Sequence, residues 1–600
     1  MTLFKPPGLQ SLPYELVAYV ARDLDIEDVF NWSLCSKNFR YIIREDRFCK
    51  PVILAKAPST LEAEEARATG HFARALRRLA KRHYALSHAS PYVLGVVGLA
   101  DSYEYINGKL CYILESRPKR WLRILDVNIS TEWELVADIP TLVSIAVPRA
   151  ANTRKYKFKV LYQAADIVSC LFSYATEYHL IIFNPKEHKL LKTYHLDSAH
   201  RIFVRNNDNY LYVGTHTGEG ADGFRNGMYL NDMFGYDIGS SICFEIFDEY
   251  FYGLSNQSVF EIDDPDWTSY YYCFRFPLDE PSRETMQIMR KEDSWRRNHV
   301  EGPIDDRWGF LKFERDEATG CISIVECRRE WLKGRSGSQR TYYTTNVVFR
   351  KEDTQGADQK PAPNVTIGGF VDPPGPNGFI PSRSPHQVYK GDNSSVPSML
   401  TRSKTHYCSY FRSCHTFLDL LDEPSRKDSD TQYIRLRAGY RCLKPVVSAV
   451  SDSSTSSFPR LSTELDTQDL STGDKRSVIY STSDGSKDAV KVLIFLTFDP
   501  AIKFERMQFG GSILGQRAKT YTQPTFLQYP AHSVSMGAES MLRFSSEQSM
   551  NTSMTKGAII PRSADQSVLP IIPPPQGTES WVSVARAMHH EIRQKFSFSL

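Results

Sequence analysis

Apolar positions in the first 90 residues recur at helical spacing. One set repeats every four residues: Leu12, Leu16, Val20 and Leu24. Pro13 suits the first position of a helix, because its missing N–H would be unpaired there, and Glu15 follows in the first turn, where the helix dipole favours a carboxylate. Asp25 and Asp28 have a spacing like that of a capping box and indicate a second helix. Another apolar set predicts a third short helix: Val29, Trp32, Leu34, Cys35, Phe39, Ile42 and Ile43.

Residues 59–84 predict one long helix. Ser59 and Glu62 have the S-x-x-E spacing of a capping box. Apolar side chains then fall on one side of the helix and arginines on another: Phe72, Leu76, Leu79 and Tyr84 against Arg74, Arg77, Arg78 and Arg82. Two interpretations are open for this helical linker, residues 51–90. It is a rigid spacer behind the first helices, a helix packed on the rim of the next domain, or both.

After Pro91 the pattern changes to short apolar and aromatic segments. Examples are KLCYILES, YHLIIFN and EYFYGLS, separated by turn residues such as Asn107-Gly108 at intervals near ten residues. This spacing predicts antiparallel strands. Weak self-similarity among NYLYVGTHTG, EYFYGLSNQS and EYINGKLCYI favours a propeller, although no WD or kelch signature is present. A β-sandwich is the alternative, but more than a dozen strands exceed the roughly seven to nine of one sandwich.

The second half of the chain alternates between apolar and polar segments. We assign residues 91–350 to the first part of the β-domain and residues 404–505 to its continuation. Residues 351–403, rich in Pro and Gly, predict a disordered insertion, and the Ser/Thr/Asp-rich residues 448–487 predict a flexible one. Residues 506–577 predict a low-order segment.

The end of the chain predicts an amphipathic helix over residues 578–600. Thr578 is a plausible N-cap, and the apolar positions recur at three and four residues: Trp581, Val584, Ala585, Met588, Ile592 and Phe596. We expect this helix to pack on the β-domain.

Composition narrows the function classes. The 600 residues suit two to four domains, and a net charge of +3 gives no overall field that would favour nucleic acid. Eleven cysteines without a CxxC pair indicate reduced thiols, and hence a cytoplasmic and/or nuclear protein. No apolar run approaches the roughly 18 to 20 residues that span a bilayer. We therefore expect neither a nucleic-acid nor a membrane partner.

Candidate chemistry is sparse. Four possible zinc ligands fall within ten residues, but their spacing is unusual for a structural site: His406, Cys408, Cys414 and His415. Asp263, Asp264 and Asp266 lack the Gly and Glu spacing of a calcium loop. No phosphate loop, GxSxG, GxGxxG or HExxH motif is present. We expect no cofactor, no metal and no enzymatic activity; a propeller-type hydrolase using Asp263, Asp264 or Asp305/Asp306 is the remaining catalytic alternative.

The order LPYEL, then a leucine before an Asp-rich turn, then LCSKNFR resembles the F-box. The resemblance covers residues 1–50, with Cys35 where valine is commoner and Phe48 near the position of the usual tryptophan. It implies docking onto a Skp-family adaptor of a cullin-based ubiquitin ligase. The residues expected to bind the adaptor are Leu12, Pro13, Glu15, Leu16, Val20, Leu24, Val29, Leu34, Cys35 and Phe39.

The expected fold is therefore an α+β multi-domain chain: a three-helix F-box, a linker helix, and a mainly antiparallel, propeller-like β-domain with disordered insertions. The resemblance implies a substrate-recognition subunit of a Skp-cullin-F-box ligase, whose β-domain binds a target protein of unknown identity. A non-ligase F-box scaffold is the alternative within the same family.

Overall fold

The computed structural model describes residues 12–100, 102–116, 119–129, 131–153, 155–215, 228–230, 232–235, 238–258, 268–298, 310–330, 339–350, 405–414, 416–424, 432–440, 455–459, 472–482, 491–504, 581–588 and 590–591. The predicted insertion at 351–403 and the predicted low-order segment at 506–577 lie outside these residues. So do Asp263, Asp264, Asp305, Asp306 and His415.

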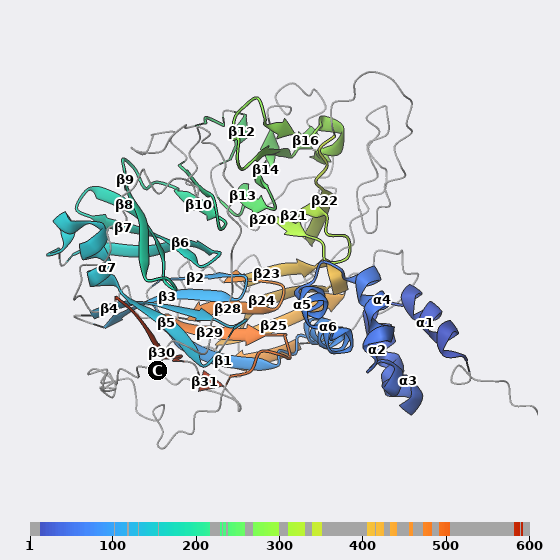
Figure 1. Ribbon diagram of the computed structural model, residues 1–600. Helices are drawn as coiled ribbons and strands as arrows, with labels where there is room; N and C mark the ends of the chain where they lie inside the picture. The colour runs from blue at the N-terminus through green and yellow to red at the C-terminus, as the bar shows by residue number, and fades with distance from the viewer. Residues whose placement is uncertain are drawn as a thin grey trace, which may run out of the picture.

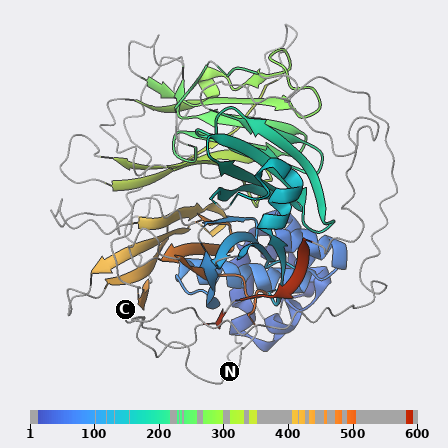
Figure 2. The same cartoon turned by 90° about the vertical axis from the view of Figure 1, so that its left-hand side faces the viewer.

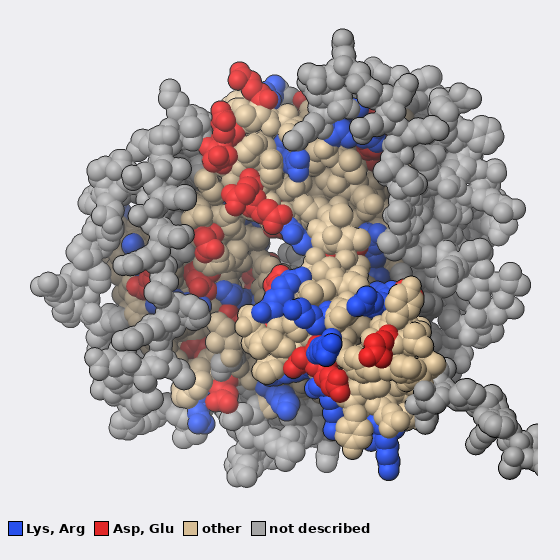
Figure 3. Space-filling view, turned by 45° about the vertical axis from the view of Figure 1, so that its right-hand side comes forward, with Lys and Arg blue, Asp and Glu red and all other residues tan. Residues whose placement is uncertain are grey.

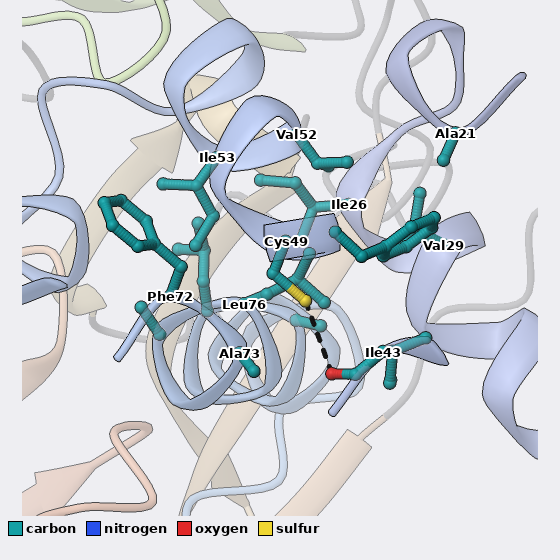
Figure 4. Packing of buried hydrophobic residues seen from close by; sticks show 14 of the residues in the cluster. Ala21, Ile26, Val29, Ile43, Cys49, Val52, Ile53, Phe72, Ala73 and Leu76 are labelled. Carbon is teal, nitrogen blue, oxygen red and sulfur yellow. Dashed lines mark hydrogen bonds between the residues drawn. The ribbon is translucent and has the colours of Figure 1, made fainter. Parts of the chain in front are cut away.

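A helical module occupies the start of the described chain and lies to one side of the β-domain (Figure 1). Its helices are α1 (Tyr14–Asp23), α2 (Ile26–Cys35), α3 (Lys37–Ile42), α4 (Asp46–Lys56), α5 (Leu61–Thr69) and α6 (Phe72–Ser87). One core joins them, and Val29, Cys49 and Leu76 are fully buried in it (Figure 4). The Cys49 thiol donates a hydrogen bond to the Ile43 carbonyl at 3.3 Å, which ties α4 to the end of α3.

The prediction of one long helix over residues 59–84 is wrong, because the chain forms two helices there. Gly70 ends α5 in the left-handed region at φ +81°, and its N–H donates to the Ala66 carbonyl. Glycine has no Cβ, so it adopts this conformation without steric cost. The predicted capping box is also wrong: the Thr60 side chain caps α5 by accepting from Ala63 N, while Glu62 is buried.

The β-domain contains five antiparallel sheets of four or five strands among the described residues, arranged as the blades of a propeller (Figure 1 and Figure 2). The two five-stranded sheets, in spatial order, are β2 (Ser102–Ile106), β3 (Lys109–Ser116), β4 (Lys119–Asp126), β5 (Trp133–Asp138) and β30 (Val582–Arg586), and then β27 (Thr472–Gly473), β28 (Ser477–Thr482), β29 (Lys491–Thr497), β1 (Val93–Ala100) and β31 (His590–Glu591). The three four-stranded sheets are β6 (Lys157–Ala164), β7 (Ile167–Tyr174), β8 (Glu177–Asn184) and β9 (Lys189–Leu196); β13 (Ile242–Phe247), β14 (Tyr250–Ser255), β17 (Tyr272–Pro277) and β18 (Gln287–Ile288); and β23 (Thr405–Phe411), β24 (Thr416–Pro424), β25 (Gln432–Tyr440) and β26 (Thr455–Pro459).

The remaining described strands form one three-stranded sheet and three two-stranded pairs. A three-stranded sheet contains β20 (Phe310–Arg315), β21 (Ile322–Glu330) and β22 (Gln339–Asn346). Three pairs are β10 (Phe203–Asn206) with β11 (Leu211–Gly214), β12 (Met233–Phe234) with β15 (Gln257–Ser258), and β16 (Thr268–Tyr270) with β19 (Trp295–Asn298). The helix α7 (Ile139–Ala146) and short 3₁₀ turns at Pro148–Ala150, Lys291–Asp293 and Arg412–Cys414 join strands. The predicted fold class, helices followed by a mainly antiparallel propeller-like domain, is confirmed.

Distant parts of the chain pair to close the ring. Strand β1 is antiparallel to β29, with Val93 opposite Thr497 and Ala100 opposite Lys491. The strand before them, β28, is also buried, so the prediction that residues 448–487 are flexible is wrong for 477–482. Only three large apolar residues, Val478 to Tyr480, lie between Ser477 and Ser481, and pairing with β29 gives this short run its structure.

The prediction of a C-terminal helix over residues 578–600 is wrong for the part that the structure describes. Residues 582–586 form the strand β30, which pairs with β5 so that Val582 lies opposite Ala137. Trp581 is buried beside this strand, in the core between neighbouring sheets, and its ring meets Phe183 edge-on at 5.4 Å. Ile592 and Phe596 lie outside the described residues.

Candidate docking site on the helical module

Helix α1 carries two apolar stripes, about 100° apart around its axis, and only one of them is covered. Val17 and Ala21 face the core of the helical module and are 2% and 0% exposed. Leu16 and Val20, on the outer side, are 51% and 37% exposed, and Leu12 just before the helix is 38% exposed. Leu16 and Val20 are one turn apart and form one exposed stripe, and Leu12 precedes them at the same spacing. A helix with an uncovered apolar stripe has a surface suited to a partner.

Further apolar side chains are exposed at the ends of α2 and α3. Leu34 is 63% exposed, and Cys35 beside it is also exposed, with its thiol donating to the Asn31 carbonyl at 3.4 Å. Tyr19 in α1 and Tyr41 in α3 are 67% and 66% exposed. These two tyrosines were not among the predicted site residues. The only sign of them in the sequence is that each falls within a predicted helix.

Three of the other predicted site residues, Leu24, Val29 and Phe39, pack in or against the core of the helical module instead. Val29 and Phe39 are buried, and Leu24, at the end of α1, packs partly against the same core. Phe39 stacks on Trp32 with ring centroids 5.3 Å apart, and its backbone N–H donates to the Ser36 side chain that caps α3. Pro13 is the N-cap of α1 and Glu15 lies exposed in its first turn. The predicted set is therefore divided between an outer surface and a core.

The helix α6 is built into both domains. Its first half contributes Phe72, Leu76 and Leu79 to the core of the helical module. Its last turns contribute Ala85 and Leu86 to a second core, formed with strands β24, β25, β28 and β29. The helix therefore acts both as a spacer and as a helix packed on the β-domain, so the two interpretations of the linker hold together.

A buried ionic cluster fixes the same junction. The Arg82 guanidinium is 1% exposed; its Nε lies 3.2 Å from Glu62 Oε1 in α5, and its Nη2 lies 3.1 Å from Glu317 Oε1 in the turn after β20. It also donates to the Lys475 carbonyl at 3.2 Å. Burial alone would raise the pKa of Glu317, but Arg82, with smaller contributions from Lys475 and His83, lowers that pKa to about 2.

A second ion pair lies one turn earlier on α6. Arg78 donates to both carboxylate oxygens of Asp499, at 2.8 and 2.6 Å, and to Glu65 at 2.6 Å. The bidentate geometry restrains the guanidinium in two directions. Burial would raise the pKa of Asp499, but Arg78 outweighs it and the pKa is lowered. On the opposite side of α6, His83 Nδ1 lies 2.6 Å from Glu27 of α2. Together these contacts fix the orientation of the first three helices, α1, α2 and α3, relative to the β-domain.

A family model described as the F-box domain matches residues 9–51. This segment is an F-box domain. The match runs through α1, α2 and α3 and ends inside α4, next to the boundary at residue 50 that the sequence predicts for the F-box. An F-box followed by a β-propeller supports, in general, the role of an adaptor that recognises a substrate.

Solved structures similar to this chain have low identity to it. They include Drosophila Semaphorin 1a extracellular domains 1-2 (9% identity, TM-score 0.29, covering 68% of this chain and 88% of that one). A prolyl endopeptidase has 9% identity and a TM-score of 0.23 over 75% of this chain and 57% of its own. The polysaccharide lyase Uly1 has 5% identity and a TM-score of 0.22 over 66% and 89%. No curated protein matches this chain.

The described residues, inside and outside the F-box, contain no group of three His, Cys, Asp or Glu side chains placed to hold a metal ion. Of the four possible zinc ligands, Cys414 is buried in the core beneath α6, and burial raises the pKa of its thiol to about 12. Such a thiol stays protonated and packs as a small apolar side chain. Among the described helices, none is long and apolar enough to cross a membrane.

Proposed function

We propose that this protein is the substrate-recognition subunit of a Skp-cullin-F-box ubiquitin ligase. Its F-box docks a Skp-family adaptor, which links it to a cullin, and its β-domain binds a target protein. The chain itself carries out no chemistry in this proposal and works in the cytoplasm and/or nucleus. The observation that supports it most is the exposed apolar stripe of α1, Leu12, Leu16 and Val20, together with Leu34.

The energetics of this surface favour a partner. Fully burying a leucine side chain contributes roughly 1.5 to 3 kcal/mol relative to leaving it in water. Leu16 and Leu34 keep half or more of their surface in the isolated chain, so a large part of that free energy is not used in folding. Association with an adaptor would recover it. Leucine side chains of this kind are candidate anchors at the centre of an interface.

The rigid junction gives the proposal its mechanism. An adaptor subunit raises the effective concentration of a target near the catalytic partner, provided that its geometry lets both engage at once. Arg82 with Glu317, and Arg78 with Asp499, join the helices that carry the F-box to the β-domain. A bound target would therefore be held at a fixed place relative to the adaptor.

Co-purification from cells tests the docking step. The tagged full-length chain should bring down the Skp-family adaptor and its cullin, and the Leu12→Ala/Pro13→Ala double variant should lose both. Leu12 supplies an anchor and Pro13 pre-sets the first turn. Both side chains are exposed, so the variant should melt within a degree or two of the native chain. Retention of the adaptor by a folded double variant would refute the proposal.

The same experiment separates the ligase from a non-ligase scaffold. A scaffold would bring down the adaptor without the cullin. If the cullin is present, ubiquitylation of proteins captured by the β-domain should depend on the first 50 residues in a reconstituted reaction. Captured proteins that are never modified would favour the scaffold.

A further inference from the structure

The solvent side of α6 carries a continuous row of basic and aromatic side chains. We call it the α6 ridge, and it consists of Arg74, Arg77, Lys81, Tyr84 and His88 in and just after α6, and Tyr92 just beyond. Steps of three and four residues place them along one side of the helix. The opposite side, with Leu76, Leu79 and Leu86, is fully buried. The ridge lies outside the F-box match, which ends at residue 51.

Its first half is basic without local compensation. The α6 sequence FARALRRLAKRHYALS contains no Asp or Glu. Two of its cations, Arg78 and Arg82, are engaged inwards with Asp499 and Glu317. In contrast, Arg74, Arg77 and Lys81 take part in none of the ion pairs found among the described residues. Figure 3 shows Lys and Arg side chains gathered over the helices in the lower part of the view, beside scattered Asp and Glu.

Carboxylates near the ridge already have other partners. Asp46 accepts from the Ala73 backbone at the start of α6, and Glu65 pairs with Arg78. Glu27 lies on the far side of the helix, against His83. Arg77 is held in place by one hydrogen bond to the Ile43 carbonyl at 3.1 Å, a neutral acceptor. Among the described residues, no carboxylate therefore forms an ion pair with the basic half of the ridge.

The second half of the ridge is aromatic and fixed. Tyr84 is 58% exposed and stacks on His88 with ring centroids 3.9 Å apart. Tyr92 is 44% exposed, and its hydroxyl donates to the Lys81 carbonyl at 3.4 Å. Its backbone N–H donates to the Thr497 carbonyl at 2.8 Å, which anchors it to the end of β29. These rings lose little conformational freedom on binding, which favours their use as contact residues.

We infer that the α6 ridge binds an acidic segment of a partner protein that carries one aromatic or aliphatic anchor residue. Three cations would meet its carboxylates, and Tyr84 with Tyr92 would pack against the anchor. From Arg74 to His88 the helix rises about 21 Å, which an extended segment of roughly six or seven residues spans. Nucleic acid fits less well, because three cations neutralise few phosphates and the chain as a whole is close to neutral.

This inference goes beyond adaptor docking and does not depend on it, since the docking surface is on α1 and α2.

Binding is measured by fluorescence anisotropy with the full-length chain and a labelled peptide of about eight residues, which contains Asp and Glu and one terminal Trp. We expect the Arg74→Glu/Lys81→Glu variant to bind at least about tenfold more weakly, because two attractive contacts become repulsive. Tyr84→Ala should weaken binding severalfold, and higher salt should weaken it as well.

Three controls make the result specific. Lys155→Glu changes an exposed cation in the loop before β6 and should leave affinity unchanged. A peptide with Gln and Asn in place of Glu and Asp should bind weakly. Melting curves and adaptor co-purification should match the native chain for every variant, which separates loss of the ridge from loss of the fold or of docking.

Several outcomes would overturn the inference. They are no binding of the acidic peptide to the native chain, equal binding of the amide peptide, and an unchanged affinity in the charge-reversed variant. Tighter binding of a single-stranded oligonucleotide of matched charge, lost in the same variant, would assign the ridge to nucleic acid instead.

Discussion

The guanidinium of Arg82 lies 3.1 Å from the carboxylate of Glu317, and the two residues are 235 positions apart in the chain. One belongs to the last helix of the helical module and the other to the turn that follows β20. Glu62 completes the cluster from α5. Breaking a buried ion pair leaves an unpaired charge, which typically costs about 3 to 5 kcal/mol. The junction between the F-box helices and the β-domain is therefore sensitive to single substitutions.

Glu317→Gln should destabilise the protein in a pH-dependent way. The pKa of Glu317 is lowered to about 2, below its ordinary value, so the ionised carboxylate stabilises the folded state at neutral pH. That contribution, on the order of 3 kcal/mol, should disappear as the pH falls from about 4.5 towards 2. Melting temperatures of the native and variant chains should accordingly differ at pH 7 and converge in acid.

Glu64→Gln is the matched control, because Glu64 is an exposed carboxylate in the same α5 helix as Glu62. It should leave the melting temperature unchanged at both pH values. A Glu317→Gln chain as stable as the native one at pH 7 would mean that the ion pair does not stabilise the junction.

Gly70→Ala should destabilise the turn between α5 and α6. The added Cβ would meet no atom within 4 Å, so space is not the obstacle. The obstacle is the φ of +81°, which costs an L-residue about 1 to 2 kcal/mol. Chemical denaturation should show a loss of about 1 kcal/mol, and Gly70→Asn should lose less because asparagine tolerates this region better. An equal loss for both substitutions would contradict the assignment.

Trp581→Ala should lower stability by about 3 to 5 kcal/mol, because it leaves a large cavity between two sheets. Val584→Ala in the same strand should change stability by less than about 0.5 kcal/mol, since Val584 is 63% exposed. Truncation before Gly577 should act like Trp581→Ala and lower the melting temperature. An unchanged melting temperature after truncation would show that β30 does not contribute to the fold.

Local patterns predicted the elements whose structure depends on nearby residues. KLCYILES becomes β3 over the same eight residues, and Leu16 and Val20, at helical spacing, lie on one exposed side of α1. Gly70, by contrast, divides the predicted linker helix into α5 and α6. A single glycine inside a helical pattern is ambiguous, because it can be tolerated or can end the helix.

Elements defined by distant partners could not be predicted in this way. Residues 582–586 show helical spacing but form a strand because β5 offers a free edge more than 400 residues earlier. Likewise, the sequence could not separate Leu16 from Val29, since both are apolar and in helices; only tertiary packing exposes one and buries the other. The partners of Arg82 depend equally on the closed fold.

The division of the predicted docking residues into an exposed set and a buried set is the central claim. It is tested by calorimetric titration of a Skp-family adaptor into the full-length chain, with melting curves of each variant. Leu16→Ala/Leu34→Ala should lower the affinity by about a hundredfold or more and leave the melting temperature unchanged, because both residues are exposed. Val29→Ala should cost about 2 kcal/mol of stability while the folded variant keeps near-native affinity. Native affinity in the folded Leu16→Ala/Leu34→Ala variant would contradict the account.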